Sequence, residues 1–302
     1  MAQLLSHSSA QEMPNLEATV SKIEKRLVAE GDTKLASVSE KLNILGELKK
    51  FSLGQFLIMN QGMDGVWNHY IAYEYPRLNK NQKPQNPMEK MLIEIIATDL
   101  QVRLELVKKI MQGELREGIS LLSIPCGIMA ELSTLDFSGI SNFNLFGVDL
   151  DSEVLVKAGE FSQKMGLKAH TQFACKDAWH LDLDNQFDIL VSLGLNIFVK
   201  EKERLLDLYR SFHKALKPGG KLLASFPTPD SFYQPDSERR YESLDPNAVR
   251  LRRIVFNEIV KIGFGKAYSS LETIEQFKTA GFAKVEIEYT PNRSPNIAIA
   301  TK

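Results

Sequence analysis

Residues 119–155 read ISLLSIPCGIMAELSTLDFSGISNFNLFGVDLDSEVL, and this stretch decides the fold. An apolar run from Ile119 to Ile124 ends at a turn with the sequence Pro-Cys-Gly, and a helical pattern follows the turn. A second apolar run begins at Phe143 and ends on Asp149. The order of strand, tight turn, helix, strand and acid is typical of a nucleotide-binding βαβ unit.

The turn and the acid have the properties that a nucleotide requires. Gly127 lets the backbone pass close to a ligand, and the start of the next helix offers unpaired N–H groups. Asp149 follows at about the expected 20-residue spacing, where an acid accepts hydrogen bonds from both hydroxyls of a ribose. We therefore favour cofactor contact for Gly127 over the alternative that it only ends a strand.

Composition restricts the class of protein. The chain has 302 residues, of which 43% are hydrophobic and 25% charged, and its net charge is −1. Lys and Arg are scattered, so the sequence indicates no nucleic-acid partner and no membrane surface. The chain has 2 cysteines, in apolar surroundings, and no apolar run of about 18 residues or more, and we expect no signal peptide. We expect a cytoplasmic protein without a metal site.

The N-terminal part of the chain has a helical pattern. Residues 1–13 are rich in Ser and Gln and show no periodicity, so we expect mobility there. Apolar residues recur at three- and four-residue steps in 14–31, 35–48 and 88–111, with an irregular stretch between the second and third of these segments. Residues 1–115 are therefore predicted to form an all-helical cap or extension.

The rest of the chain alternates between apolar runs typical of buried strands and patterns typical of amphipathic helices. Further apolar runs, at 171–175, 187–192 and 221–226, are separated by amphipathic helical patterns. Strands that are apolar along their whole length indicate a parallel sheet covered on both faces. Residues 116–302 are predicted to be one α/β domain, with an insertion at 227–269.

Several motifs in the same order resemble the class I S-adenosylmethionine-dependent methyltransferases, over residues from about 119 to 302. LLSIPCGIM resembles the first motif of that family, FGVDLDSEVL its second strand with the ribose-binding acid, and CKDAW its third-strand motif. FDILVSLGLNIF resembles the fourth strand, and LYRSFHKALKPGGKLLASF the helix, turn and fifth strand. The ending LETIEQFKTAGFAKVEIEYTPNRSPNIAIATK resembles the closing helix and hairpin. The resemblance implies a Rossmann-like, seven-stranded, mostly parallel α/β sheet with an antiparallel last strand, preceded by the all-helical region.

The resemblance also implies a cofactor, S-adenosyl-L-methionine, whose product is S-adenosyl-L-homocysteine. In this family the acid of the third-strand motif accepts the adenine amino group, which assigns that role to Asp177, and the next N–H, of Ala178, meets a ring nitrogen. The implied cofactor-binding residues are Pro125, Cys126, Gly127, Asp149, Leu150, Asp177, Ala178, Trp179 and Ser192.

The first turn departs from the family pattern. The family usually has an acid near the end of the first strand and two or three glycines in the turn. Here Ser123 occupies the position of the acid, and Pro125 and Met129 stand where glycine is usual. A subset of the family resembles this SxPCG form, but the contacts to the amino-acid end of the cofactor do not carry over.

Several of these residues also have a structural alternative. Asp177 is of a type that stabilises turns through its own backbone, and Trp179 either stacks on the base or fills the core. Cys126 is more often a small buried hydrophobe than a nucleophile.

Two segments are candidates for the acceptor side. An aromatic cluster, which includes Trp67, His69 and Tyr70, is either a satellite core or a lid over the acceptor. The loop that contains Tyr233 follows the fifth strand at its C-terminal end, where open α/β sheets bind ligands. We expect Trp67, Tyr70 and Tyr233 to line the substrate pocket, and His69 and Tyr70 are the candidates for a catalytic base.

The sequence thus predicts a methyltransferase that acts on an unidentified small-molecule acceptor. Methyl transfer from a sulfonium is an in-line displacement, so it requires no metal. A non-catalytic cofactor-binding or scaffold protein on the same fold is the main alternative. A nicotinamide-dependent oxidoreductase is a weaker one, because its fingerprint has three spaced glycines that the turn lacks. The N-terminal helices pack either on their own chain or against a second copy in a homodimer.

Overall fold

The computed structural model describes residues 15–302, so the expectation for residues 1–13 lies outside the described residues. The chain divides into two compact units. The sheet unit comprises Gln101–Arg240 and Phe264–Lys302, and the helical unit comprises residues 15–100 and Tyr241–Gly263. The units do not follow chain order, because residues 241–263 of the expected insertion pack with the N-terminal helices rather than with the sheet.

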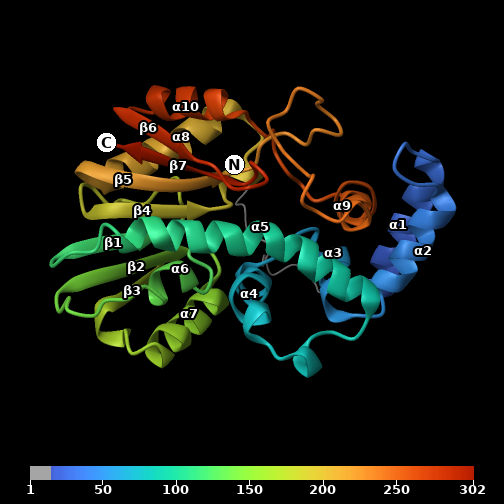
Figure 1. Cartoon of the computed structure of the whole chain (residues 1–302), viewed down its shortest axis with the longest axis horizontal. Helices are drawn as coiled ribbons and strands as arrows, with labels where there is room; N and C mark the ends of the chain where they lie inside the picture. Colours follow the sequence, from blue (N-terminus) through green and yellow to red (C-terminus); the bar gives the residue numbers. More distant parts are fainter. Residues whose placement is uncertain (1–14) are drawn as a thin grey trace. The chain divides into compact units, whose positions relative to one another are not determined.

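The sheet unit contains a seven-stranded sheet with the order β3-β2-β1-β4-β5-β7-β6 (Figure 1). Strands β1 to β5 are parallel, whereas β7 runs antiparallel to both β5 and β6. This arrangement confirms the predicted Rossmann-like sheet with its antiparallel last strand. The strands are β1 (Ile119–Ser123), β2 (Phe143–Asp149), β3 (Thr171–Cys175), β4 (Phe187–Leu193), β5 (Leu216–Phe226), β6 (Lys284–Glu288) and β7 (Asn296–Thr301).

Helices cover both faces of the sheet, which explains why its central strands are apolar along their whole length. Leu121 packs in one apolar cluster and its neighbour Leu122 in the other, because successive side chains of a strand point to opposite faces. Figure 1 shows α8 (Lys202–Ala215) and α10 (Ser270–Thr279) on one side, with α6 (Ala130–Ser133) and α7 (Ser152–Lys164) on the other. The C-terminal part of α5 (Pro87–Gln112) packs on the same face as α6. Two 3-10 turns, η4 (Lys168–His170) and η5 (Asn196–Phe198), complete the unit.

The helical unit confirms the predicted helical region. Its elements before α5 are α1 (Leu16–Glu30), α2 (Val38–Leu48), α3 (Ser52–Asn60), α4 (Gly65–His69), η1 (Tyr70–Glu74), η2 (Tyr75–Arg77) and η3 (Lys80–Gln82). The N-terminal part of α5 belongs to this unit, as do α9 (Pro246–Arg253) and the π-helix η6 (Ile254–Ile259). Residues 51–75, expected to be irregular, are mostly helical. The Asp64 side chain caps α4 by accepting the Trp67 N–H at 2.8 Å.

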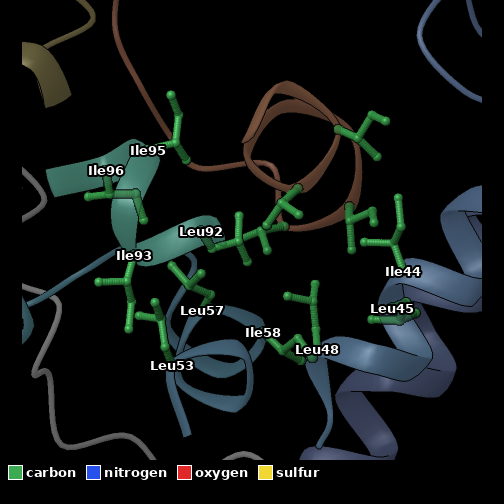
Figure 2. Packing of buried hydrophobic residues seen from close by; sticks show 14 of the residues in the cluster. Ile44, Leu45, Leu48, Leu53, Leu57, Ile58, Leu92, Ile93, Ile95 and Ile96 are labelled. Carbon is green, nitrogen blue, oxygen red and sulfur yellow. The ribbon is translucent and has the colours of Figure 1, made fainter. Parts of the chain in front are cut away.

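An apolar core holds the helical unit together. Figure 2 shows residues of α2, α3 and α5 that meet in this core, among them Leu48, Leu57 and Leu92, each of which is fully buried. Gly54 makes this packing possible, since a Cβ there would lie 2.2 Å from the carbonyl oxygen of Leu48. Gly54 is therefore a close-packing residue inside a helix, within the stretch that the sequence had indicated to be irregular.

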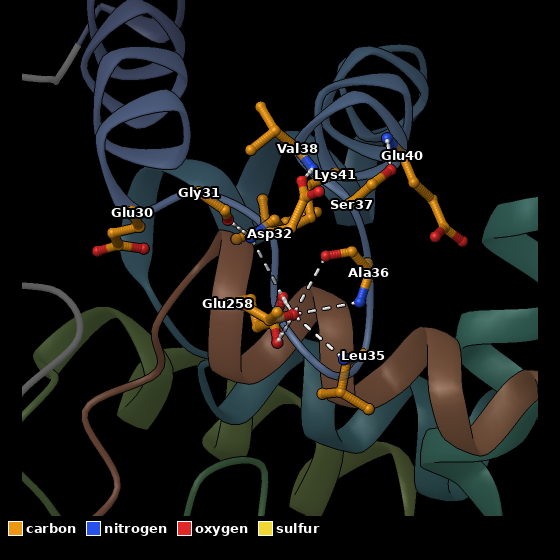
Figure 3. Close-up of polar contacts among 12 residues, drawn as sticks. Glu30, Gly31, Asp32, Leu35, Ala36, Ser37, Val38, Glu40, Lys41 and Glu258 are labelled. Carbon is orange, nitrogen blue, oxygen red and sulfur yellow. Dashed lines mark hydrogen bonds and ion pairs between the residues drawn. The ribbon is translucent and has the colours of Figure 1, made fainter.

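A buried lysine ties the segment 241–263 to the N-terminal helices (Figure 3). The Lys41 side chain is almost completely buried, and its Nζ donates to the Gly31 carbonyl at 2.8 Å and lies 3.6 Å from Oε2 of Glu258. Thr33 Oγ1 donates to the same carboxylate at 2.8 Å. A buried ammonium group is costly without partners, so these contacts fix the position of η6 against α1 and α2.

Within residues 15–302, no helix combines the length and the apolar character that crossing a membrane requires.

We expect Gly54→Ala to lower the free energy of unfolding by about 1–3 kcal/mol or more, because the added methyl group would collide with the backbone at Leu48. Gly46→Ala is the matched control. Gly46 lies in α2 with no atom within 4 Å of the added Cβ, so alanine is expected to stabilise the helix by about 0.5–1 kcal/mol. Denaturant unfolding of both variants measures the difference. Equal stability of Gly54→Ala and the unmodified protein would contradict the packing described for α2 and α3.

Candidate functional site

The candidate site begins where β1 and β2 end. The Gly127 N–H donates to Oδ2 of Asp149 at 3.0 Å, and the Asp151 N–H donates to Oδ1 at 3.1 Å. Gly127 has a φ of +50°, a conformation that favours glycine. The strand order reverses between β1 and β4, so the turn lies at the switch point where open α/β sheets bind ligands. The structure thus brings together Gly127 and Asp149, which the sequence had paired.

Asp149 and Cys126, both predicted to bind the cofactor, differ in the chemistry that their surroundings allow. Burial raises the pKa of Asp149, while hydrogen bonds from the Gly127 and Asp151 N–H groups act in the opposite direction. Burial, and then the charge of Asp149, raises the pKa of the Cys126 thiol far above its usual range. A thiol that stays protonated is a poor nucleophile, so the small buried hydrophobe is the reading that fits Cys126.

Met129 occupies a position where the family usually has glycine, and it has a left-handed backbone with a φ of +59°. Such a conformation costs about 1–2 kcal/mol for a residue with a side chain. The Met129 side chain is buried in the apolar cluster that contains Leu121 and Leu132. Core packing therefore offsets the backbone strain that glycine would avoid.

A buried carboxyl group lies at the end of β1. Ser123 Oγ donates a hydrogen bond to Oε1 of Glu131, the second residue of α6, and both side chains are buried. Burial raises the pKa of Glu131, whereas the hydrogen bond from Ser123 and the positive charge of Arg103 lower it. Glu131 was not predicted from the sequence, because α6 spans only Ala130–Ser133 and is too short for a periodic signal.

The third-strand motif has a locally organised acid. Oδ1 of Asp177 accepts the Trp179 N–H at 3.2 Å, and Oδ2 lies 3.0 Å from Nδ1 of His180. No hydrogen bond from the Ala178 N–H is found within the described part of the chain. The Asp177 carboxylate therefore stabilises its own turn, and the neighbouring Ala178 N–H is the free donor that an adenine ring nitrogen requires.

Of the remaining cofactor candidates, Trp179 and Ser192 pack against or within the core of the sheet unit, whereas Leu150 lies at a strand end. The Trp179 indole donates to the Arg204 carbonyl at 2.8 Å, and the Arg204 guanidinium lies 4.6 Å from the ring centroid. Trp179 also packs against the apolar cluster beneath α8, which favours core filling over base stacking. Ser192 is buried within β4, opposite Ala224 of β5, and Leu150 directly follows β2.

The acceptor candidates lie in separate units. Trp67 and Tyr70 meet edge to face at 5.7 Å and pack against the core of the helical unit, as a satellite core would. Nε2 of the buried His69 lies 3.4 Å from Oε1 of Glu74. Burial, followed by the charges of Glu89 and Glu74, raises the pKa of Tyr70.

Tyr233 belongs to the sheet unit, in the loop that follows β5. It is 53% exposed and meets Phe232, itself 41% exposed, edge to face at 5.0 Å. This exposed aromatic pair comes from the C-terminal end of a parallel strand, at the edge of the sheet that also contains the turn after β1. Among residues 15–302, no group of three or more His, Cys, Asp or Glu side chains has the arrangement of a metal site.

Comparison with known families matches residues 122–220 to a family model described as "Methyltransferase domain". Among curated proteins, Phosphoethanolamine N-methyltransferase 3 of Arabidopsis thaliana is 30% identical over 157 residues, which cover 49% of this chain and 30% of that protein. The chain thus spans less than a third of the length of this relative.

Two solved structures are similar over most of the chain. A possible exported protein from Bordetella parapertussis is 30% identical, with a TM-score of 0.89 and 99% of each chain covered. The S-adenosylmethionine-dependent methyltransferase SibL is 14% identical, with a TM-score of 0.54 over 87% of this chain and 75% of its own. At that identity the likeness to SibL concerns the fold alone.

We expect Met129→Gly to destabilise the protein, although it restores the glycine that the family usually has. Relief of the backbone strain is worth about 1–2 kcal/mol, whereas loss of a buried Met side chain costs about 2–5 kcal/mol. Gln61→Gly is the control: Gln61 also has a left-handed backbone, with a φ of +51°, but its side chain is exposed, so a change below about 1 kcal/mol is expected. Denaturant midpoints measure both. A Met129→Gly protein more stable than the original would contradict the packing role of this side chain.

Proposed function

We propose that this chain, in which residues 122–220 match a methyltransferase domain, transfers a methyl group from S-adenosyl-L-methionine to a small-molecule acceptor. The observation that carries the proposal is the carboxylate of Asp149, held by the Gly127 N–H at 3.0 Å at the switch point of the sheet. A ribose needs an acceptor of this kind, next to a turn without bulky side chains.

In the proposed cofactor site, each strand end has its own role. Asp149 accepts the two ribose hydroxyls, and the backbone of Pro125, Cys126 and Gly127 lies against the sugar and the sulfur. The open N–H of Ala178 donates to an adenine ring nitrogen, and the Asp177 carboxylate accepts the adenine amino group. Leu150, Trp179 and Ser192 complete the list of proposed contacts, of which Trp179 and Ser192 act through packing because both are engaged in the core.

The sulfonium of the cofactor supplies an activated methyl group, so the residues need to align the acceptor and exclude water. Alignment of this kind is worth up to about 7–11 kcal/mol in well-oriented systems. A side-chain base is required only where the acceptor atom must lose a proton. Of the candidates, Tyr70 has a pKa raised by burial, which disfavours a tyrosinate near neutral pH, and His69 is paired with Glu74.

Two observations favour a small organic acceptor. The relative from Arabidopsis thaliana is a phosphoethanolamine N-methyltransferase by name, which makes small amines the first class of acceptor to assay. The exposed pair Phe232 and Tyr233 offers an apolar surface at the ligand-binding edge of the sheet, and such surfaces suit small organic acceptors.

Calorimetric titration with S-adenosylmethionine and S-adenosylhomocysteine tests the cofactor assignment. We expect micromolar binding that Asp149→Ala abolishes, because the ribose hydroxyls lose their acceptor. Asp184→Ala is the matched control: it removes an exposed acid of the same unit, paired only with Lys214 among the contacts found, and should bind as the original protein does. A folded protein that binds neither ligand would favour the scaffold alternative, and binding of a nicotinamide cofactor instead would favour an oxidoreductase.

Substitutions on the acceptor side should separate turnover from cofactor binding. We expect Tyr233→Ala to lower the rate of methyl transfer at least tenfold while the affinity for S-adenosylhomocysteine stays unchanged, because the Tyr233 side chain is assigned to the acceptor. Val156→Ala provides a control, since it removes a 64% exposed apolar side chain from α7, which packs on β2 and β3. Equal loss of turnover and cofactor affinity would count against the assignment.

A further inference from the structure

The order of the strands sets the direction of an elongated cofactor. In the proposed function, on which this inference rests, adenine lies at the end of β3 and the ribose at the end of β2. The next strands in the sheet are β1 and then β4. A ligand that continues along the edge therefore places its third part, the amino-acid end of S-adenosylmethionine, over the ends of β1 and β4.

The sheet unit has a negative and a positive group at these two strand ends. Glu131 receives the hydrogen bond from Ser123, the last residue of β1. Arg103, from α5, lies beside the residue that follows β4, since a methyl group on Gly194 would lie 3.4 Å from Nη1 of Arg103. The positive charge of Arg103 also lowers the pKa of the Glu131 carboxyl, against the larger effect of burial.

The pair matches the chemistry of an amino acid. At neutral pH the amino-acid end of the cofactor carries an ammonium group and a carboxylate. An ammonium group is best stabilised by a carboxylate acceptor, and a carboxylate by the fork of donors of a guanidinium. The position of Glu131 also accounts for the unusual first turn, because Ser123 stands where the family has its acid and receives a carboxyl group from α6 instead.

A purely structural role explains less about Glu131. A fully buried carboxyl group is expensive, and an apolar residue of similar size would support α6 at lower cost. Buried acids with a shifted pKa and a specific charged neighbour are characteristic of functional sites. Glu131 and Arg103 have these properties at the strand ends that the cofactor is expected to reach.

We propose that Glu131 and Arg103 form the binding site for the amino-acid end of S-adenosylmethionine. Glu131 accepts hydrogen bonds from the ammonium group, and Arg103 donates hydrogen bonds to the carboxylate. A side chain at position 194 would meet the guanidinium, since its Cβ would already lie 3.4 Å from Nη1 of Arg103. The two residues are binding residues that fix the sulfur, and hence the methyl group, relative to the acceptor.

Two ligands that differ only at this end test the proposal. S-adenosylhomocysteine contains the amino-acid end, whereas 5′-methylthioadenosine retains adenine, ribose and sulfur but lacks it. We expect Glu131→Gln and Arg103→Met to weaken S-adenosylhomocysteine binding at least tenfold, because each loses a charge-assisted hydrogen bond, and to leave methylthioadenosine binding unchanged. Glu105→Gln is the control, since it removes a 62% exposed carboxylate from α5, two residues from Arg103.

The outcomes separate this inference from the proposed function. Equal affinity of the original protein for the two ligands would overturn the proposed binding site, and this test requires no variant and therefore no assumption about folding. Variants that bind S-adenosylhomocysteine as tightly as the original protein would overturn it as well, as would variants that lose both ligands equally. If the original protein binds neither ligand, the proposed methyltransferase function is itself contradicted.

Discussion

A single hydrogen bond, from the Gly127 N–H to the Asp149 carboxylate, joins the turn after β1 to the end of β2. The constraint behind it is that a partly buried carboxylate must be held by donors, and here the donors are backbone N–H groups of the turns themselves. The carboxylate therefore holds the turn in place, while its remaining lone pairs stay available for a ligand. Loss of the Asp149 carboxylate would both release the turn after β1 and remove the acceptor for the ribose. The rest of the proposed site therefore depends on this residue.

The same principle recurs elsewhere in the chain. Glu131 is buried against Ser123 at the end of β1, and Lys41 is buried against Gly31 and Glu258 in the helical unit. The first group lies at the ligand-binding edge of the sheet, where the proposed chemistry uses charge. Lys41 joins distant segments of the chain. Residues 241–263 follow β5 in the sequence, yet they pack with the N-terminal helices. Burial of a charge therefore has two different uses in one chain.

Much of the fold was predictable because its signals are local. Apolar runs bounded by turns predicted the strands from β1 to β4 to within a residue or two. The antiparallel β7 was predicted from the resemblance of the C-terminal stretch to the closing helix and hairpin of the family. The helices around Gly54 were missed because a glycine reads as a break, whereas here it permits close approach to Leu48. The placement of residues 241–263 depends on contacts with partners more than 200 residues away, such as that of Thr33 with Glu258, which no periodicity reveals.

The candidate site was predictable to a different degree. Gly127 and Asp149 were paired from spacing, and the structure brings them into contact. Glu131 and Arg103 escaped notice, since one lies in a very short helix and the other near the middle of α5, with no motif around either. Whether Trp67 and Tyr70 form a core or a lid also depends on tertiary packing, and in the helical unit both contact the core. A site assembled from side chains on separate elements leaves little trace in sequence order.

The most direct measurement is a crystal structure of the complex with S-adenosylhomocysteine. The account predicts both ribose hydroxyls within hydrogen-bond distance of the Asp149 carboxylate, with the adenine toward β3 and the amino group toward Glu131. A nucleoside bound in the opposite direction along the strand ends, or away from Asp149 altogether, would contradict it.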